Sequence, residues 1–337
     1  MTSQRRAGND CKVGGMNPLL SRFVAAAALA AFAALASAQD YPSRAIRLVV
    51  PFAPGGSTDT LARIVGQQLS EQTGQPVIVD NRPAGGGAAG SELVAKGQPD
   101  GYTLLIGSIA TMVIAGAMNP RLGYDAMRDF EHIGLWVTFP LALVVQASNP
   151  AKGLKDLIDQ AKAKPGTLKH GLQGIATSSH MFNELMCHLA GIKVVNVPYK
   201  GGAPALTGVI VGEVDYAMIA VSTAQAQVAA GRVRALGVTS AKAAPSLPNV
   251  PPIGAVVKGY EALNFHGLHG PAKMPRAVTA RLHETTTRIL KSQGVQQKLG
   301  ALDMDVAAGT PEEYRAFIKA QIAQWTPIVK ATGARVD

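Results

Sequence analysis

The chain has 337 residues, of which 47% are hydrophobic and 16% are charged, with 32 Lys and Arg against 22 Asp and Glu. This length allows about two domains, and the hydrophobic content is enough for real cores. The net charge of +10 suits anionic ligands or a membrane surface, but the basic residues are scattered, and no basic block with interleaved aromatic residues indicates a nucleic-acid-binding protein.

The first 38 residues have the pattern of a secretory signal. Residues 16–38 read MNPLLSRFVAAAALAAFAALASA, in which one arginine precedes an apolar run and small residues end the segment. The apolar run is shorter than the ~20 residues that cross a bilayer, which disfavours a membrane anchor. We expect cleavage between Ala38 and Gln39, export to the periplasm, and Met16 as a possible true start. Removing residues 1–38 takes away four basic residues and one acidic residue, so the net charge falls from +10 to +7.

From residue 41 onward, predicted strands alternate with predicted helices. Strands are expected at 46–50, 77–79, 102–106, 141–146, 194–197, 214–219 and 235–238, and helices at 58–72, up to 96, at 154–163 and from 204. Such alternation is typical of parallel sheets in α/β domains. The proline-rich segment 243–252 is expected to be a surface connection. Two amphipathic helices, at 275–290 and 311–330, would return to the first domain, so that the chain crosses between two lobes more than once.

Glycine and hydroxyl residues gather where predicted strands end and helices begin. The junctions read PGGSTD at 54–59, AGGGAAG at 84–90, GSIAT at 107–111, GIATSSH at 174–180 and YKGGAPA at 199–205. In open α/β sheets these junctions face the ligand crevice, and each helix start carries unpaired N–H donors and about half a positive charge. Gly55 and Gly56 leave the backbone open to a ligand, and Ser57 or Thr58 can cap the helix. Repetition of the pattern predicts an anion site with a carboxylate as the simplest occupant, although one Gly-Gly turn alone would need no ligand.

Several segments together resemble the Bug family, the TctC-like substrate-binding proteins of tripartite tricarboxylate transporters. These segments are VVPFAPGGSTD, VDNRPAGGGAAGSELVAKGQPDGYTLLIGS, VPYKGGAPAL, GEVDYAM and GRVRALGVTS. The resemblance runs from about residue 41 to the C-terminus. It implies a type II periplasmic-binding-protein-like α/β fold, with lobe 1 at 41–140 plus 263–337 and lobe 2 at 141–262. It also implies a monomeric receptor, not an enzyme, which needs no cofactor or metal, closes on a small carboxylate and delivers it to the membrane components of a transporter.

The resemblance also implies ligand contacts in both lobes. In the first lobe they fall on Phe52, Pro54, Gly55, Gly56, Ser57, Asp59, Ser108 and Thr111. In the second they fall on Gly174, Ala176, Thr177, His180, Tyr199, Lys200, Gly201, Gly202, Ala203 and Ile219, with Phe265 at the hinge. Because Asp59 would repel a carboxylate, we expect it to cap backbone amides, with an ammonium group on the ligand as the alternative.

Departures from the family pattern predict a drier second half of the pocket. Leu172 and Ala176 stand where the family usually has Ser and Gly, Ile219 stands where it often has Asp, and Phe265 replaces a common Trp. A second charged group there would lose its water without matched donors. We therefore expect a carboxylate with an apolar or aromatic body, although Lys200, His180 or His266 could still receive a second anion.

Other motifs favour alternative functions only weakly. The turn at 85–90 matches G-x-G-x-x-G, but it does not directly follow a strand and no acidic residue lies about 20 positions on, which disfavours a dinucleotide site. His266 and His269 lack a third metal ligand nearby. Ser178 and His180 would allow a secreted hydrolase, but there is no G-x-S-x-G elbow. A sensor subunit that presents its ligand to a membrane receptor stays open as a further alternative.

Overall fold

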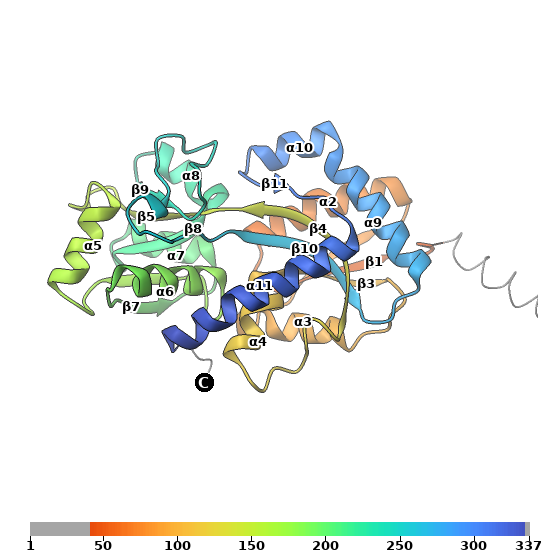
Figure 1. Cartoon of the computed structure of the whole chain (residues 1–337). Coiled ribbons are helices and arrows are strands. Elements are labelled where there is room, and N and C mark those ends of the chain that lie inside the picture. Colours follow the sequence, from red (N-terminus) through yellow and green to blue (C-terminus); the bar gives the residue numbers. More distant parts are fainter. Residues whose placement is uncertain (1–40, 334–337) are drawn as a thin grey trace, which may run out of the picture. The chain divides into compact units, whose positions relative to one another are not determined.

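The computed structural model describes residues 41–333, and from Pro42 onward these residues form one compact unit. The unit contains two β-sheets flanked by helices (Figure 1). The strand order is β11-β4-β10-β3-β1-β2 in the first sheet and β7-β6-β8-β5-β9 in the second. The secretory signal predicted for residues 1–38 lies outside the described residues. Within residues 41–333, no helix combines the length and the apolar character that crossing a membrane requires.

The elements of each sheet come from separate stretches of chain. The first sheet consists of β1 (Ile46–Val50), β2 (Val77–Asn81), β3 (Thr103–Ser108), β4 (Phe130–Phe139), β10 (Asn264–Pro271) and β11 (Asp305–Val306). The helices and turns in these stretches are α2 (Ser57–Thr73), η1 (Gly85–Gly87), α3 (Ala88–Ala95), η2 (Ala110–Ile114), α4 (Ala115–Met118), α9 (Arg276–Lys291), α10 (Gln293–Gly300) and α11 (Pro311–Thr332). We call this part lobe 1.

The second sheet and its helices, which we call lobe 2, lie between β4 and β10 in the sequence. Its strands are β5 (Leu141–Gln146), β6 (Lys169–Leu172), β7 (Val195–Pro198), β8 (Tyr216–Ala220) and β9 (Val233–Val238). Its helices are α5 (Leu154–Ala163), α6 (Ser178–Ala190), α7 (Gly202–Ile210) and α8 (Val221–Ala229), and the turn η3 (Ile253–Ala255) lies on the way back to β10. The predicted residue boundaries of the lobes, at 140/141 and 262/263, stay a prediction.

The α/β class predicted from the alternation is confirmed, but the sheets are mixed rather than parallel. β10 runs antiparallel to β3 and β4, and β5 runs antiparallel to β8 and β9. The prediction of parallel pairing is confirmed for β1 with β2 and β3 and for β6 with β7 and β8. It fails for the other pairs, and in the first sheet it fails because the chain leaves lobe 1 along β4 and returns along β10. A strand that leaves and a strand that returns must run in opposite directions. The two crossings lie side by side, since Asn264 pairs with Phe139.

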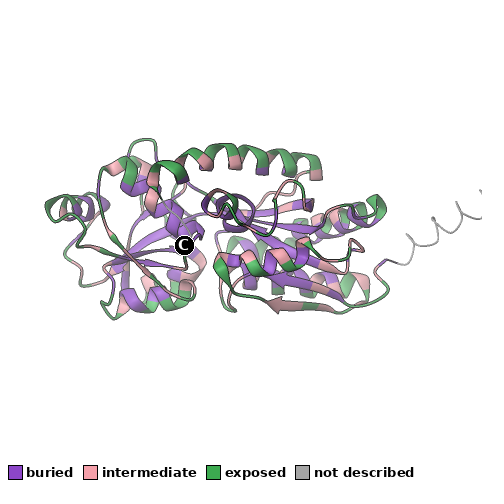
Figure 2. Cartoon of the chain, turned by 90° about the horizontal axis from the view of Figure 1, so that it is seen from below, coloured by how far each residue is buried: buried purple, intermediate pink, exposed green. Residues whose placement is uncertain are grey.

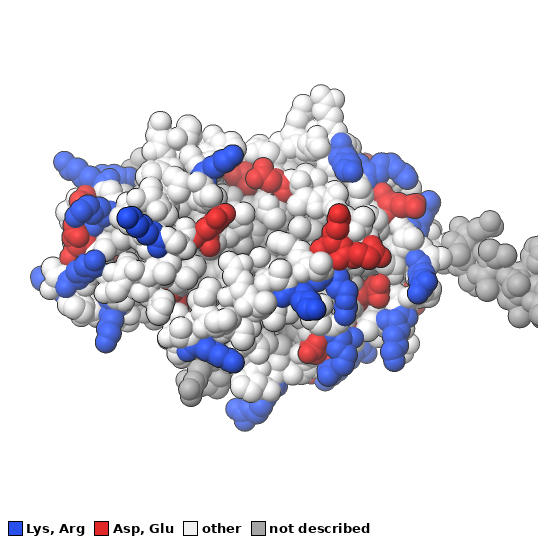
Figure 3. All heavy atoms as spheres, in the orientation of Figure 1, with Lys and Arg blue, Asp and Glu red and all other residues white. Residues whose placement is uncertain are grey.

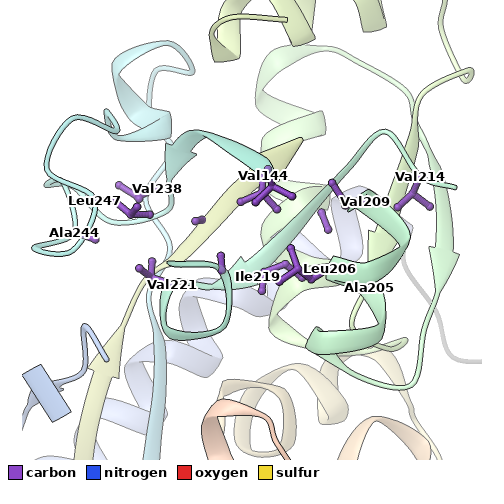
Figure 4. Close-up of a cluster of buried hydrophobic side chains, with 14 residues drawn as sticks. Val144, Ala205, Leu206, Val209, Val214, Ile219, Val221, Val238, Ala244 and Leu247 are labelled. Carbon is purple, nitrogen blue, oxygen red and sulfur yellow. The ribbon is translucent and has the colours of Figure 1, made fainter. Parts of the chain in front are cut away.

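The cores of both lobes lie on the sheets. The strands are mostly buried and the outer helix faces are exposed (Figure 2). In lobe 2, Val144 of β5 and Ile219 of β8 pack with Leu206 and Val209 of α7 (Figure 4). Burial of each such side chain contributes roughly 1.5–3 kcal/mol. The cores thus hold the strand ends in fixed positions, which is what a binding site between the lobes requires.

Both lobes also bury histidine side chains. In lobe 1, His269 of β10 lies with Nδ1 3.2 Å from His132 Nδ1 and with Nε2 2.8 Å from the hydroxyl of Tyr314 in α11. In lobe 2, His170 Nδ1 lies 3.0 Å from Asn196 Oδ1. Burial lowers the pKa of His132 to about 4 and the pKa of His170 to about 3. These two rings are therefore neutral at pH 7.

We predict that the free energy of unfolding falls as the pH is lowered from 7 to 5. An unfolded histidine takes up a proton near pH ~6.5, whereas folded His132 and His170 stay neutral down to about 4 and about 3. In that interval the unfolded state binds more protons, so each histidine removes roughly 2 kcal/mol of stability between pH 7 and pH 5. Urea unfolding at both pH values measures the slope.

The matched controls for this prediction are two single substitutions. His170→Gln should reduce the slope of the free energy of unfolding against pH. His188→Gln should leave this slope unchanged, because His188 is exposed. Identical slopes in the two variants would contradict the assignment of the acid sensitivity to buried His170.

Candidate functional site

A cavity of about 180 Å³ lies where residues of both lobes meet. Lobe 1 contributes Phe52, Ala53, Pro54, Gly55, Gly56, Ser57, Thr58, Ser108, Ala110, Asn264 and His266, and lobe 2 contributes Gln173, Thr177, Ser178, Lys200, Gly201, Gly202, Ala203 and Pro204. These lining residues include one lysine and no acidic side chain. A larger groove of about 600 Å³ is lined by residues 111–128 and by α11, all in lobe 1. We therefore take the smaller, shared cavity as the candidate site.

Three helices begin at this cavity. α2 begins at Ser57, α6 at Ser178 and α7 at Gly202, and all three residues line the cavity. At none of these three helix starts does the N-cap residue supply a capping side chain. The first N–H groups of a helix have no partner inside the helix, and the helix dipole adds about half a positive charge. The cavity is thus suited to negatively charged groups.

Asp59 holds the loop that precedes α2. Its Oδ2 accepts the N–H of Gly55 at 3.0 Å, both oxygens accept from the Arg63 guanidinium at 3.0 Å, and Oδ1 accepts from Asn81 Nδ2 at 3.1 Å. Burial alone would raise the pKa of Asp59, but the hydrogen bonds from Arg63, Gly55 and Asn81 outweigh it and hold the pKa below its usual value. Asp59 therefore binds a backbone amide, as expected, and does not line the cavity.

The two glycines before α2 have different backbone conformations. Gly55 has a φ of +84°, which favours glycine, whereas Gly56 has a φ of −84° and a ψ of 173°. A Cβ on Gly56 would meet only one backbone oxygen, at 3.9 Å. Gly56 is also the N-cap, so the prediction that Ser57 or Thr58 caps α2 was wrong, because the helix begins one residue earlier than expected. Their hydroxyl oxygens lie instead 3.4 and 3.2 Å from His266 Nε2.

The floor of the cavity comes from β3 and β10. Ser108 and His266 are opposite each other in the antiparallel register of these strands. The Ser108 hydroxyl is buried and has no hydrogen-bond partner within residues 41–333. Burial lowers the pKa of His266 to about 3, so this ring is neutral. Asn264 donates from Nδ2 to Ser178 Oγ at 3.0 Å and so links the two lobes.

Eight of the predicted contacts do not line the cavity. They are Asp59, Thr111, Gly174, Ala176, His180, Tyr199, Ile219 and Phe265. Ile219 lies in the lobe 2 core (Figure 4), because β8 is an inner strand of its sheet and all five of its residues are buried. Phe265 alternates with His266 along β10 and so faces the other side of the sheet. There its ring lies 5.1 Å from the Phe317 ring, centroid to centroid.

Several of the other predicted residues hold the loops that line the cavity but do not face the cavity themselves. Thr111 Oγ1 accepts the N–H of Ser108 at 3.0 Å, and His180 Nδ1 accepts the N–H of Ala176 at 3.4 Å. Tyr199 packs against the lobe 2 core. These side chains shape the cavity without facing it.

The residues behind the prediction of a dry second half of the pocket do not line the cavity. They are Leu172, Ala176, Ile219 and Phe265, which are all buried and lie outside the cavity lining. The lobe 2 wall combines polar residues such as Gln173 and Lys200, which follow the ends of β6 and β7, with the small residues of segment 201–204. The wall therefore offers hydrogen-bond donors and one positive charge.

The described residues do not bring together the groups of a metal site or a hydrolase. Between residues 41 and 333 no group of three His, Cys, Asp or Glu side chains is placed to hold a metal ion. His266 lines the cavity, while His269 contacts Tyr314. Ser178 Oγ accepts from Asn264, and the structure shows no hydrogen bond between Ser178 and His180 in this part of the chain. The nucleophile and base of the hydrolase alternative are thus not paired.

The chain resembles a defined set of known proteins. Residues 61–334 match the family described as "Tripartite tricarboxylate transporter family receptor". A protein of the tcbD-tcbE intergenic region of a Pseudomonas species is 38% identical over 291 residues, which cover 86% of each chain. Protein BugT of Bordetella pertussis is 31% identical over 313 residues, which cover 92% of this chain and 95% of BugT.

Solved structures resemble the whole described unit. The R. palustris protein Rpa4515 with adipate has a TM-score of 0.85 and 32% identity, and the match covers 88% of this chain and 100% of that one. The periplasmic binding protein BugD has a TM-score of 0.83 and 30% identity, with coverage of 88% and 99%. MatC from Rhodopseudomonas palustris with bound malate has a TM-score of 0.81 and 28% identity, with coverage of 86% and 100%. The two-lobed binding-protein fold is confirmed.

We predict that Asp59→Ala lowers the free energy of unfolding of the ligand-free protein by about 1–3 kcal/mol, because the Gly55 N–H and the Asn81 amide lose a charged acceptor. The control is Asp159→Ala, which breaks an exposed pair with Lys155 that also spans four residues of a helix. Exposed pairs contribute less than about 1 kcal/mol. Chemical denaturation at pH 7 measures both variants, and equal losses would show that Asp59 does not hold the loop.

Proposed function

Because the chain belongs to the tripartite tricarboxylate transporter receptor family, we propose that it captures a small dicarboxylate between its lobes and delivers it to the membrane components of such a transporter. One observation carries this proposal. The shared cavity is surrounded by three helix starts from the two lobes and contains no acidic side chain.

Both walls of the cavity favour a negative group. On the lobe 1 side, the groups that favour it are the start of α2 and the unpartnered hydroxyl of Ser108. On the lobe 2 side they are the starts of α6 and α7 together with Lys200. No ion pair among the described residues involves Lys200. A charge at a helix start contributes about 0.3–1 kcal/mol when exposed and up to ~2 kcal/mol when partly buried. A ligand with a carboxylate at each end would use both walls.

The size of the cavity limits the ligand. Pockets for drug-sized ligands have volumes of about 300–1,000 Å³, whereas this cavity has about 180 Å³. The volume therefore suits a ligand well below drug size, such as a dicarboxylate of four to six carbons. The similar structures of Rpa4515 and MatC hold adipate and malate, respectively, which supports this range. A dicarboxylate therefore replaces the apolar carboxylate that the sequence favoured.

Capture would work by closure of the lobes rather than by covalent chemistry. A ligand can favour the closed arrangement only if it binds that arrangement better than the open one. Contacts from both lobes meet this condition, because a ligand in an open cleft would touch only one of them. The chain segments that cross between the lobes, around Phe139 and Asn264, are where hinge bending would occur.

We place the protein in the periplasm and propose that it acts as a monomer, without enzymatic activity. The similar protein BugD is described as a periplasmic binding protein, and the N-terminal sequence has the pattern of a secretory signal. Basic and acidic side chains are interspersed on the face shown in Figure 3. We assign the preference for anions to the cavity, because three helix starts and Lys200 surround it.

We predict that adipate and malate raise the melting temperature of the mature protein more than benzoate does. Lys200→Met should weaken dicarboxylate binding about tenfold, or ~1.4 kcal/mol, because one carboxylate loses its cationic neighbour. Lys242→Met is the control, since this lysine is exposed and does not line the cavity. Thermal shift and calorimetric titration measure these effects. Stabilisation by benzoate alone would contradict the proposal of a dicarboxylate.

We predict that protein isolated from the periplasm begins at Gln39. The small residues at positions 36–38 fit the cleavage pattern of a signal peptidase. Intact-mass spectrometry identifies the first residue, and deletion of residues 1–15 should leave export unchanged, with Met16 as the start. Periplasmic protein that retains residues 1–38 would show that the segment is not a cleaved signal.

A further inference from the structure

Turn η1 of lobe 1 meets the loop after β6 of lobe 2 beside the cavity. A Cβ on Gly86 would lie 2.7 Å from the carbonyl oxygen of Ile175 and 3.3 Å from the Cβ of Ala176. None of these three residues lines the cavity. A real Cβ does not approach a backbone oxygen within 3.0 Å, so the two lobes can meet here only if residue 86 is glycine.

The lobe 2 side of this contact has an unusual backbone. Ala176 has a φ of +61°, and it is one of three non-glycine residues with a positive φ among the described residues. The left-handed region is unfavourable for alanine, and such a conformation persists only where its surroundings hold it. The N–H of Ala176 is accepted by His180 Nδ1 at 3.4 Å, and Thr177 Oγ1 donates to the carbonyl of Gly174 at 2.7 Å. The loop thus presents the Ala176 methyl group to Gly86.

We propose that Gly86 and Ala176 form a latch between the lobes, which sets the affinity for the ligand without touching it. The proposal rests on the proposed function, because closure matters only if the cavity traps a solute. The apparent affinity of a binding protein is its intrinsic affinity multiplied by the fraction of molecules in the competent state. A contact that exists only when the lobes meet raises this fraction, so it slows the escape of a bound ligand.

The latch differs from two hydrogen bonds that also join the lobes. The hydrogen bond from Asn264 to Ser178 joins two residues of the cavity lining, so a substitution there would also change ligand contacts. The hydrogen bond from the Ser246 N–H to Asp303 Oδ1 at 2.9 Å connects segments outside the cavity lining. Among the described glycines, only at Gly86 would an added Cβ clash across the lobes, which makes this contact separately testable.

The neighbouring Gly85 supplies a matched control. Gly85 has a φ of +57° and Gly86 a φ of +64°, so an alanine at either position takes a left-handed backbone. At Gly85 the new Cβ would meet only the Cβ of Ala88, at 3.6 Å and within lobe 1. The difference between Gly86→Ala and Gly85→Ala therefore isolates the contact with lobe 2 from the backbone cost.

The experiment compares the wild type, Gly86→Ala and Gly85→Ala by small-angle X-ray scattering, with and without adipate as the probe. We expect Gly86→Ala to have the largest radius of gyration in the ligand-free state. We also expect adipate to dissociate from it at least about tenfold faster in stopped-flow measurements, with similar melting temperatures for both ligand-free variants. Equal radii and equal dissociation rates for Gly86→Ala and Gly85→Ala would overturn the latch.

A second variant keeps the test decisive if Gly86→Ala does not fold. Ala176→Gly relieves the backbone strain of an alanine with a positive φ, and it removes the contact of the Ala176 methyl group with Gly86. It should therefore raise the melting temperature of the ligand-free protein and at the same time speed dissociation of adipate, a combination that a merely structural role would not produce. A higher melting temperature with an unchanged ligand-free radius and an unchanged dissociation rate would overturn the proposal. If adipate binds none of the proteins, the dicarboxylate proposal fails, while the ligand-free radii still decide the latch.

Discussion

The site depends on backbone N–H groups at helix starts that have no hydrogen-bond acceptor within the helix. The first N–H groups of a helix have no hydrogen-bond partner inside the helix. A capping side chain or water normally accepts these hydrogen bonds. Here α2, α6 and α7 all begin at one cavity, and none has a capping side chain at its N-cap. The nearby carboxylate, Asp59, accepts from Gly55, Asn81 and Arg63 instead. The cavity is consequently a place where an acceptor must come from outside the chain.

The crossing strands bring the three helix starts together. β4 leaves lobe 1, β10 returns to it, and the pairing of Phe139 with Asn264 holds the two segments side by side. β10 then runs antiparallel to β3, which places His266 opposite Ser108 at the floor of the cavity. The antiparallel strands are therefore required for the site. A single sheet cannot supply both walls, and the antiparallel pairing of β3 with β10 forms the floor between them.

Much of the site was predictable because its signals are local. A strand followed by glycine, a hydroxyl residue and a helix marks a junction. Four of the five junctions contribute residues to the cavity lining, including Gly56 and Lys200, whereas the junction at 84–90 contributes none. Two kinds of residue could not be predicted in this way. Asn264 and His266 lie on β10. The glycines and histidines of β10 interrupt the apolar pattern from which a strand is predicted. Ile219 and Phe265 were assigned by position in a family pattern, which does not say which face of a strand a side chain occupies. An assignment of 264–271 as a strand would have placed Phe265 opposite His266 by alternation alone.

The neutral histidine in the floor leaves ligand recognition independent of its own protonation. Because burial lowers the pKa of His266 to about 3, this ring does not gain charge in a moderately acidic environment. A carboxylate ligand, in contrast, is half protonated near pH ~4. The helix starts favour only the ionised form of the ligand. Recognition in acidic surroundings would therefore follow the ionisation of the solute rather than that of this histidine, so that the receptor measures the concentration of the anion and not of the total acid.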